Sequence, residues 1–172
     1  HAIRVFSNRI TKNDTPNFAP KGNIVAGVPN GTGVLVMANR DVHVFANAIG
    51  DNATANVLIV GYQQKFTDAT YHPLASNILV RDNDLGRAGF APGPQFGGGD
   101  QLAAAFGGTL PAIIWDGTGT NIQIKQATPV LSLGLTDPAT GPESAKPSIV
   151  DMAFEPLLPE PKPVILPASM EA

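Results

Sequence analysis

The sequence predicts an all-β fold, a right-handed parallel β-helix (solenoid) of about four coils with long loop insertions. Three observations lead to this prediction. Six short β-branched runs of four to six residues end in Asn, Gly or Asp, as strands closed by turns do. The runs recur in phase along the chain, whereas a sandwich gives no such internal phase. Helical periodicity is almost absent, and DQLAAAFGG at 100–108 is the one candidate for a short helix, with Asp100 as its cap.

The first repeat joins AIRVFSNRITKN at 2–13 with DVHVFANAIGDN at 41–52, at a spacing of 39 residues. A third copy, SNILVRDNDLG, follows at 76–86, and TGVLVM at 32–37 matches ANVLIV at 55–60 with a shift of 23 residues. The longer spacings equal one coil plus the Pro-containing insertions 14–29 and 63–75, which we expect to be loops. The coils are predicted to begin near Ile3, Val34, Val57 and Ile113, with these pairs in register: Ile3 with Val42, Val5 with Val44, Ile10 with Ile49, Val34 with Val57 and Val36 with Ile59.

One asparagine occupies the same place in each of the three copies. Asn8, Asn47 and Asn83 follow the strand at the point where the chain must turn. An amide side chain both donates and accepts, so stacked asparagines would satisfy buried backbone groups, at about 1 kcal/mol per hydrogen bond. We predict an amide ladder, which ends where the fourth copy places Ala127.

The composition shifts after residue 137. Eight of the sixteen prolines lie between Pro138 and Pro167, so this region is expected to be extended. The sequence therefore predicts β-helix coils over 1–137 and a Pro-rich C-terminal cap or tail over 138–172, since the last coil of a solenoid must be covered. The first coil has no such cap, which predicts either lost coils or end-to-end association through the open N-terminal coil.

Composition also limits the classes of partner. Charged residues make up 15% of the chain and the net charge is −3, so no basic field is available for nucleic acid. No apolar stretch approaches the ~20 residues of a membrane span. There is no cysteine, the three histidines are not paired at ligand spacing, and GPQFGGGDQ at 93–101 lacks the Lys-Ser/Thr of a phosphate loop. We therefore expect neither a metal nor a cofactor.

Several stretches resemble a known group of proteins. NRITKNDTPNFAPKGNIVAGVPNGTGVLVMANRDVHVFANAIGDNATANVLIVGYQ, then ASNILVRDNDLG and LPAIIWDG, look like the C-terminal part of exported bacterial right-handed parallel β-helix repeat proteins. These are fold-level relatives of pectate lyases and alginate epimerases. The resemblance implies a periplasmic or extracellular location, in some members as a lipoprotein, and an exported, cytochrome-like protein partner. It implies no particular activity.

The candidate ligand-binding residues come from the outward positions of the repeat. Residues between core positions should face away from the core, which gives one column through Arg4, His43, Leu79 and Gln123 and a second through Phe6, Phe45, Arg81 and Lys125. The turn before 41–52 and the ends of the companion strands add further polar groups. The candidates are Arg40, Asp41, His43, Tyr62, Arg81 and Asp116.

Three functions are compatible with these residues. The favoured one is a non-catalytic, exported module that binds a protein or a glycan, because polar residues on a β-face occur in any such fold. The second is a polysaccharide lyase or C5-epimerase for acidic sugars, in which cations neutralise a carboxylate and a base removes a proton. The Asp-Pro-His-Asp motif typical of epimerases is absent, and YHP at 71–73 is the nearest string. The third is a self-stacking structural subunit.

Overall fold

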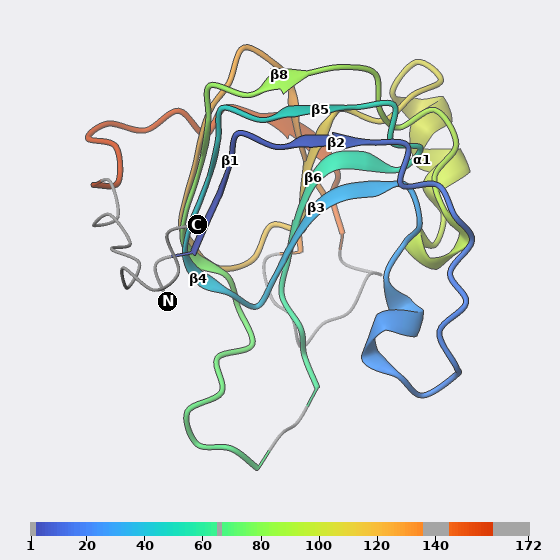
Figure 1. The fold of residues 1–172 in the computed structure, drawn as a ribbon, viewed down its shortest axis with the longest axis horizontal. Helices are drawn as coiled ribbons and strands as arrows, with labels where there is room; N and C mark the ends of the chain where they lie inside the picture. The colour runs from blue at the N-terminus through green and yellow to red at the C-terminus, as the bar shows by residue number, and fades with distance from the viewer. Residues whose placement is uncertain (1–2, 65–66, 136–144, 160–172) are drawn as a thin grey trace, which may run out of the picture.

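The strands of the chain form three sheets, seen in Figure 1 as three walls around a common interior. The computed structural model describes residues 3–64, 67–135 and 145–159. Sheet A contains β1 (Ile3–Phe6), β4 (Arg40–Phe45), β7 (Ser76–Arg81) and β10 (Thr120–Lys125), in that order. Sheet B contains β2 (Arg9–Thr11), β5 (Ala48–Gly50) and β8 (Asp84–Leu85). Sheet C has the order β12 (Ser148–Val150), β11 (Val130–Ser132), β9 (Ile113–Trp115), β6 (Ala55–Val60) and β3 (Thr32–Met37).

Short helices lie between the strands. The 3-10 helix η1 (Ile24–Gly27) is in the first insertion, and η2 (Pro94–Phe96) precedes the α-helix α1 (Gly99–Ala105). The predicted helix at 100–108 is confirmed, but Asp100 is not its cap. Gly98 occupies that position with φ +69° and makes no side-chain cap bond.

The predicted pairing of the strands is confirmed residue by residue. Each of the predicted pairs is parallel, and the partners follow the phase of the apolar template in all three sheets. The register in turn brings the outward positions into the two predicted columns along sheet A. The observed pairs include Ile3 with Val42, Val5 with Val44, Ile10 with Ile49, Val34 with Val57 and Val36 with Ile59.

The predicted fold class is corrected by the structure. The chain does not form a uniform all-β solenoid of about four equivalent coils. It forms three separate, mostly parallel sheets of four, five and three strands, together with helix. β12 is antiparallel to β11, so sheet C is not purely parallel. The apolar phase determined which strands pair, but it contained no information on how many strands each sheet holds or on the helix between them.

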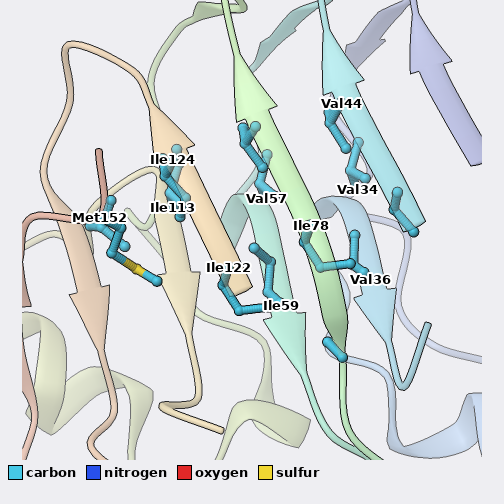
Figure 2. Close-up of a cluster of buried hydrophobic side chains, with 14 of the residues drawn as sticks. Val34, Val36, Val44, Val57, Ile59, Ile78, Ile113, Ile122, Ile124 and Met152 are labelled. Atoms are coloured by element: carbon cyan, nitrogen blue, oxygen red, sulfur yellow. The ribbon is translucent and has the colours of Figure 1, made fainter. Parts of the chain in front are cut away.

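The main core fills the interior between the sheets. Figure 2 shows its side chains converging from β3, β4, β6, β7, β9 and β10. Val44, Val57, Ile59, Ile78 and Ile113 are each 0% exposed. Burying a side chain of this size stabilises the folded state by about 1.5–3 kcal/mol, so this cluster is a major source of stability.

The predicted amide ladder is confirmed and is longer than expected. Asn47 Oδ1 accepts from Asn8 Nδ2 at 3.0 Å, and Asn83 Oδ1 accepts from Asn47 Nδ2 at 2.9 Å. The fourth position is taken by Gln126, and not by the predicted Ala127. Its Oε1 accepts from the Asn83 backbone N–H at 2.6 Å. The longer side chain of glutamine reaches this position from one residue earlier.

The described part of the C-terminal region lies against the last strands of sheets A and C. β12 pairs with β11, and Met152 is buried in the main core. The Met152 carbonyl accepts from the Ile124 backbone N–H at 2.9 Å. Residues 138–144 and 160–172 of the predicted cap or tail lie outside the described residues.

Candidate binding groove

A groove begins on the outer face of sheet C, the face turned away from the main core, and reaches the turn between β3 and β4. It consists of three hollows of about 340, 340 and 420 Å³. We name them the apolar hollow, the middle hollow and the polar hollow, and together the binding groove. Adjacent hollows share wall residues and therefore lie next to one another. The apolar and middle hollows share Ile24, Met37 and Tyr62, and the middle and polar hollows share Ala38, Asp68 and Tyr71.

The apolar hollow follows from strands that are apolar on both faces. In β3, Val34 and Val36 point into the main core, so Leu35 and Met37 point outward. β6 repeats this arrangement with Leu58 outward. Such continuous apolar runs are typical of parallel strands that are covered on both sides. The other apolar walls include Ile24, Val28, Val60, Phe96, Leu133 and Leu135.

A second apolar core covers part of this outer face. Ala103 of α1 packs with Leu58, Ile114 and Leu131, all of which are at most 5% exposed. α1 lies beside the sheet on the right of Figure 1. The helix therefore covers one part of the outer face, and the apolar hollow occupies a neighbouring part.

One buried polar atom at the apolar hollow lacks a partner. Gln95 lines the hollow, and its buried Oε1 accepts no hydrogen bond in the part of the chain that the structure describes. An unsatisfied buried acceptor costs about 1–3 kcal/mol. This side chain is therefore a local weakness of the fold.

The polar hollow lies where sheet C meets sheet A, between the turn at 38–40 and residues 68–74 of the second insertion. The turn between β3 and β4 supplies one wall, and the insertion that follows β6 supplies the other. Figure 1 shows this insertion in green, extending below the sheets. The lining residues are Ala38, Asn39, Arg40, Asp68, Thr70, Tyr71, His72 and Leu74.

Hydrogen bonds hold two tyrosines in place, Tyr62 just before the second insertion and Tyr71 within it. The Tyr71 hydroxyl donates to the Tyr62 carbonyl, and the Tyr62 backbone N–H donates to the Pro73 carbonyl at 2.7 Å. Burial raises the pKa of Tyr71 above its ordinary value of 10.0, and electrostatic interaction with Tyr62 raises it further. Tyr71 therefore keeps its hydroxyl proton at physiological pH and with it this hydrogen bond.

An Asx turn shapes the tip of the insertion. Asp68 Oδ1 accepts from the Thr70 backbone N–H and from the Thr70 hydroxyl, both at 2.8 Å. These two hydrogen bonds, the backbone one first, lower the pKa of Asp68 below its ordinary value of 3.8. The Asp68 carbonyl also accepts from the Tyr71 backbone N–H at 3.1 Å, which brings Tyr71 to the groove.

Asp116, a predicted site residue, lines the apolar hollow but is occupied by the fold. Its Oδ2 accepts from the Gly61 backbone N–H at 2.6 Å, and its Oδ1 accepts from the Thr118 backbone N–H at 2.8 Å. The side chain is buried. Asp116 therefore fixes the end of β6, and with it the position of Tyr62, which follows Gly61.

Asp41, a second predicted site residue, belongs to a further ladder of polar side chains. Its Oδ1 accepts from Asn77 Nδ2 at 2.9 Å, and Asn77 Oδ1 accepts from Asn121 Nδ2 at 2.9 Å. All three have a left-handed backbone, with φ between +54° and +58°. Asp and Asn tolerate this conformation, so Asp41 is placed to make the corner between sheets C and A.

His43 and Arg81 lie on the outer face of sheet A. His43 is only 4% exposed, so the predicted solvated column does not present it to solvent. In the same column Gln123 holds residues 156–158 by accepting from the Leu158 backbone N–H at 2.8 Å. Arg81 pairs with Asp82 at 2.6 Å and its guanidinium carbon lies 4.6 Å from the centre of the Phe45 ring.

The structure thus brings three of the six predicted residues to the binding groove, namely Arg40, Tyr62 and Asp116. The sequence interpretation did not include Tyr71 and His72 among the candidates. YHP at 71–73 was the signal that could have led to them. It pointed to the correct insertion, but nothing in the sequence showed which strands this insertion approaches.

Two further properties concern the described residues only. Across 3–64, 67–135 and 145–159, no three His, Asp or Glu side chains gather into a set that would ligate a metal ion. In the same residues, no helix has the length and apolar character needed to cross a lipid bilayer.

Comparisons with family models, with curated proteins and with solved structures gave no match to this chain.

Proposed function

We propose that the chain is a non-catalytic binding module that holds a glycan in the polar hollow of the binding groove. The observation that carries this proposal is the composition of that hollow. Tyr71, with Tyr62 beside it in the middle hollow, offers aromatic surface. Asn39, Arg40 and His72 offer hydrogen-bonding groups around it.

This combination matches the chemistry of a sugar. The C–H faces of a sugar ring pack on aromatic rings, and its hydroxyls need both donors and acceptors. A volume of about 420 Å³ is within the range of small-ligand sites. The hydrogen bonds of Tyr71 and Asp68 hold the walls in place before the ligand arrives, which reduces the ordering cost of binding.

The experiment is a binding series with alginate, pectate and neutral glucan oligosaccharides, followed by calorimetry. Arg40→Ala and His72→Ala are each expected to weaken binding about tenfold, which corresponds to one good polar contact. Arg87→Ala is the matched control, because Arg87 pairs with Asp51 away from the groove. Failure of all these glycans to bind, or equal binding by Arg40→Ala and the wild type, would count against the proposal.

The same polymers test the alternative of a lyase or epimerase for acidic sugars. The cations and bases considered for that reaction were Arg40, His43, Tyr62 and Arg81. Within the described residues, His43 and Arg81 lie on sheet A and do not line the groove with Arg40 and Tyr62. We expect no unsaturated product with ultraviolet absorbance from alginate or pectate, and its formation would replace the binding proposal with an enzymatic one.

Association with a second protein surface is a separate candidate, favoured by the exposed edge of the sheets. β1, β2 and β3 are the terminal strands of sheets A, B and C. On β1, Ile3 is 39% and Phe6 is 48% exposed. Edge strands with exposed apolar residues favour pairing with another chain. We propose a second copy of this chain as the partner; sedimentation analysis of the wild type and of Phe6→Lys at high concentration would reveal it, and a monomer throughout would contradict it.

The exported location implied by the family resemblance is likewise a proposal. Cell fractionation of the full-length protein tests it directly.

A further inference from the structure

The binding groove extends well beyond the part that a glycan needs. The polar hollow ends at Ala38, Asp68 and Tyr71, and the middle hollow continues from these residues to Met37 and Tyr62. Beyond them lies the apolar hollow, of about 340 Å³. Apart from Tyr62, Gln95 and Asp116 the residues lining this last part offer no polar side chain. Most hydroxyls of a sugar would therefore lose hydrogen bonds to water there without gaining partners.

The walls of the binding groove become more polar from the apolar hollow to the polar hollow. At one end Leu35, Val60 and Leu133 are apolar, and at the other end Arg40, Thr70 and His72 are polar. The tyrosines, each with an apolar ring and a polar hydroxyl, stand between the two ends. A ligand that matched this surface along its whole length would have one apolar end and one polar end.

We infer that the ligand is an amphiphilic glycoconjugate, a sugar joined to an apolar chain. The sugar of this ligand lies in the polar hollow, and its alkyl chain lies in the apolar hollow. The bond that joins the two passes Tyr62 and Tyr71. This inference rests on the proposed function and adds the class of ligand. Burying the chain contributes affinity in proportion to its apolar surface, which a free sugar does not have.

The inference predicts how affinity depends on chain length. Each methylene buried in the apolar hollow is expected to strengthen binding by about threefold to fourfold. The gain should stop once the hollow is full. The probes are alkyl glucosides of increasing chain length, kept below their critical micelle concentrations, with free glucose oligosaccharides and the corresponding 1-alkanols as the two half-ligands.

A matched pair of Val→Thr variants tests whether the alkyl chain of the ligand lies in the apolar hollow. Val60 lines the apolar hollow, whereas Val25 is 53% exposed on η1 and does not line it. Val60→Thr should lower the affinity for the long-chain glucosides and, with it, the gain per methylene. Val25→Thr should change neither. Circular dichroism of both variants verifies that they fold.

The outcomes separate the inference from the proposed function. If affinity for the sugar is present but independent of chain length, the inference is wrong and the glycan-binding function stands. If the 1-alkanols bind as tightly as the glucosides, the sugar contributes nothing and both are wrong. Absence of binding by every probe likewise overturns both. An affinity that rises with the length of the alkyl chain, and that is weakened by Val60→Thr but not by Val25→Thr, supports both.

Discussion

The outer faces of sheets A and C are built from the same kind of parallel strands but are used differently. On sheet A, the chain's own residues 156–158 bind Gln123, and Leu79 and His43 are almost fully buried. On sheet C, α1 covers only part of an apolar face, and the binding groove occupies a neighbouring part. Alternation along a strand thus determines which side of the sheet a residue faces, but not whether that side is covered by solvent, by another part of the chain or by a ligand.

The largest effect is expected in the amide ladder, which supports the strands of sheet A at the corner next to sheet B. Asn47→Ala removes the donor to the Val5 and Phe45 carbonyls and the acceptor for Asn8. Because several buried groups lose their partners together, the free energy of unfolding should fall by about 3–5 kcal/mol. Urea denaturation measures this change. Asn8→Ala, at the exposed edge, should cost about 1 kcal/mol, and equal losses for both variants would show that burial does not set the effect.

The burial of the outer faces is tested by a second pair of variants. Leu79 on sheet A and Leu58 on sheet C are 1% and 3% exposed. Leu79→Ala and Leu58→Ala should each lower the free energy of unfolding by about 2–4 kcal/mol, because each leaves a cavity. Chemical denaturation of the two variants is the measurement. If Leu79→Ala costs less than about 1 kcal/mol, as for a surface position, the covered state of sheet A is refuted.

Replacing each of two glutamines by methionine should change the stability of the fold in opposite directions. On sheet A, Gln123→Met removes the hydrogen bonds to the Pro156 carbonyl and the Leu158 N–H, and should destabilise the fold by about 1–2 kcal/mol. In η2, beside the apolar hollow, Gln95→Met removes an unsatisfied buried acceptor and should be neutral or stabilising by up to about 1 kcal/mol. Differential scanning calorimetry gives both signs, and a loss at Gln95 as large as that at Gln123 would disprove the contrast.

The smallest effect concerns the pH dependence of the insertion over the polar hollow. The pKa of Asp68 is lowered by the hydrogen bonds from Thr70, so the charged form stabilises the turn. This contribution is complete above the ordinary pKa of 3.8 and is lost as pH falls through the lower pKa of the folded state. An NMR titration of the Thr70 amide should therefore show a midpoint below 3.8. In Asp68→Asn the same amide should not titrate, and a wild-type midpoint at or above 3.8 would contradict the assignment.

How far the sequence led can be judged from particular residues. The phase of Val42, Val44 and Ile49 gave the correct partners in sheets A and B, since an apolar residue out of register would face away from the core. The same phase led to a uniform solenoid, which the unequal sheets and α1 correct. At the site, Arg40 and Tyr62 follow from their positions at a turn and at the end of a strand. His72 does not, because its insertion carries no repeat of apolar residues from which the position of a side chain could be predicted.

By itself, the sequence determined the strand partners, the asparagine ladder and the short helix, because each depends on local spacing and on the need to pair buried polar groups. The burial of His43 could be seen only in the folded chain. The same holds for the corners that Asp41 and Asp116 support, and for the insertion that brings Tyr71 and His72 beside Arg40. The physical reason is that these outcomes depend on contacts between segments far apart in the chain. No local pattern of apolar and polar residues encodes which distant segment will cover an outward face.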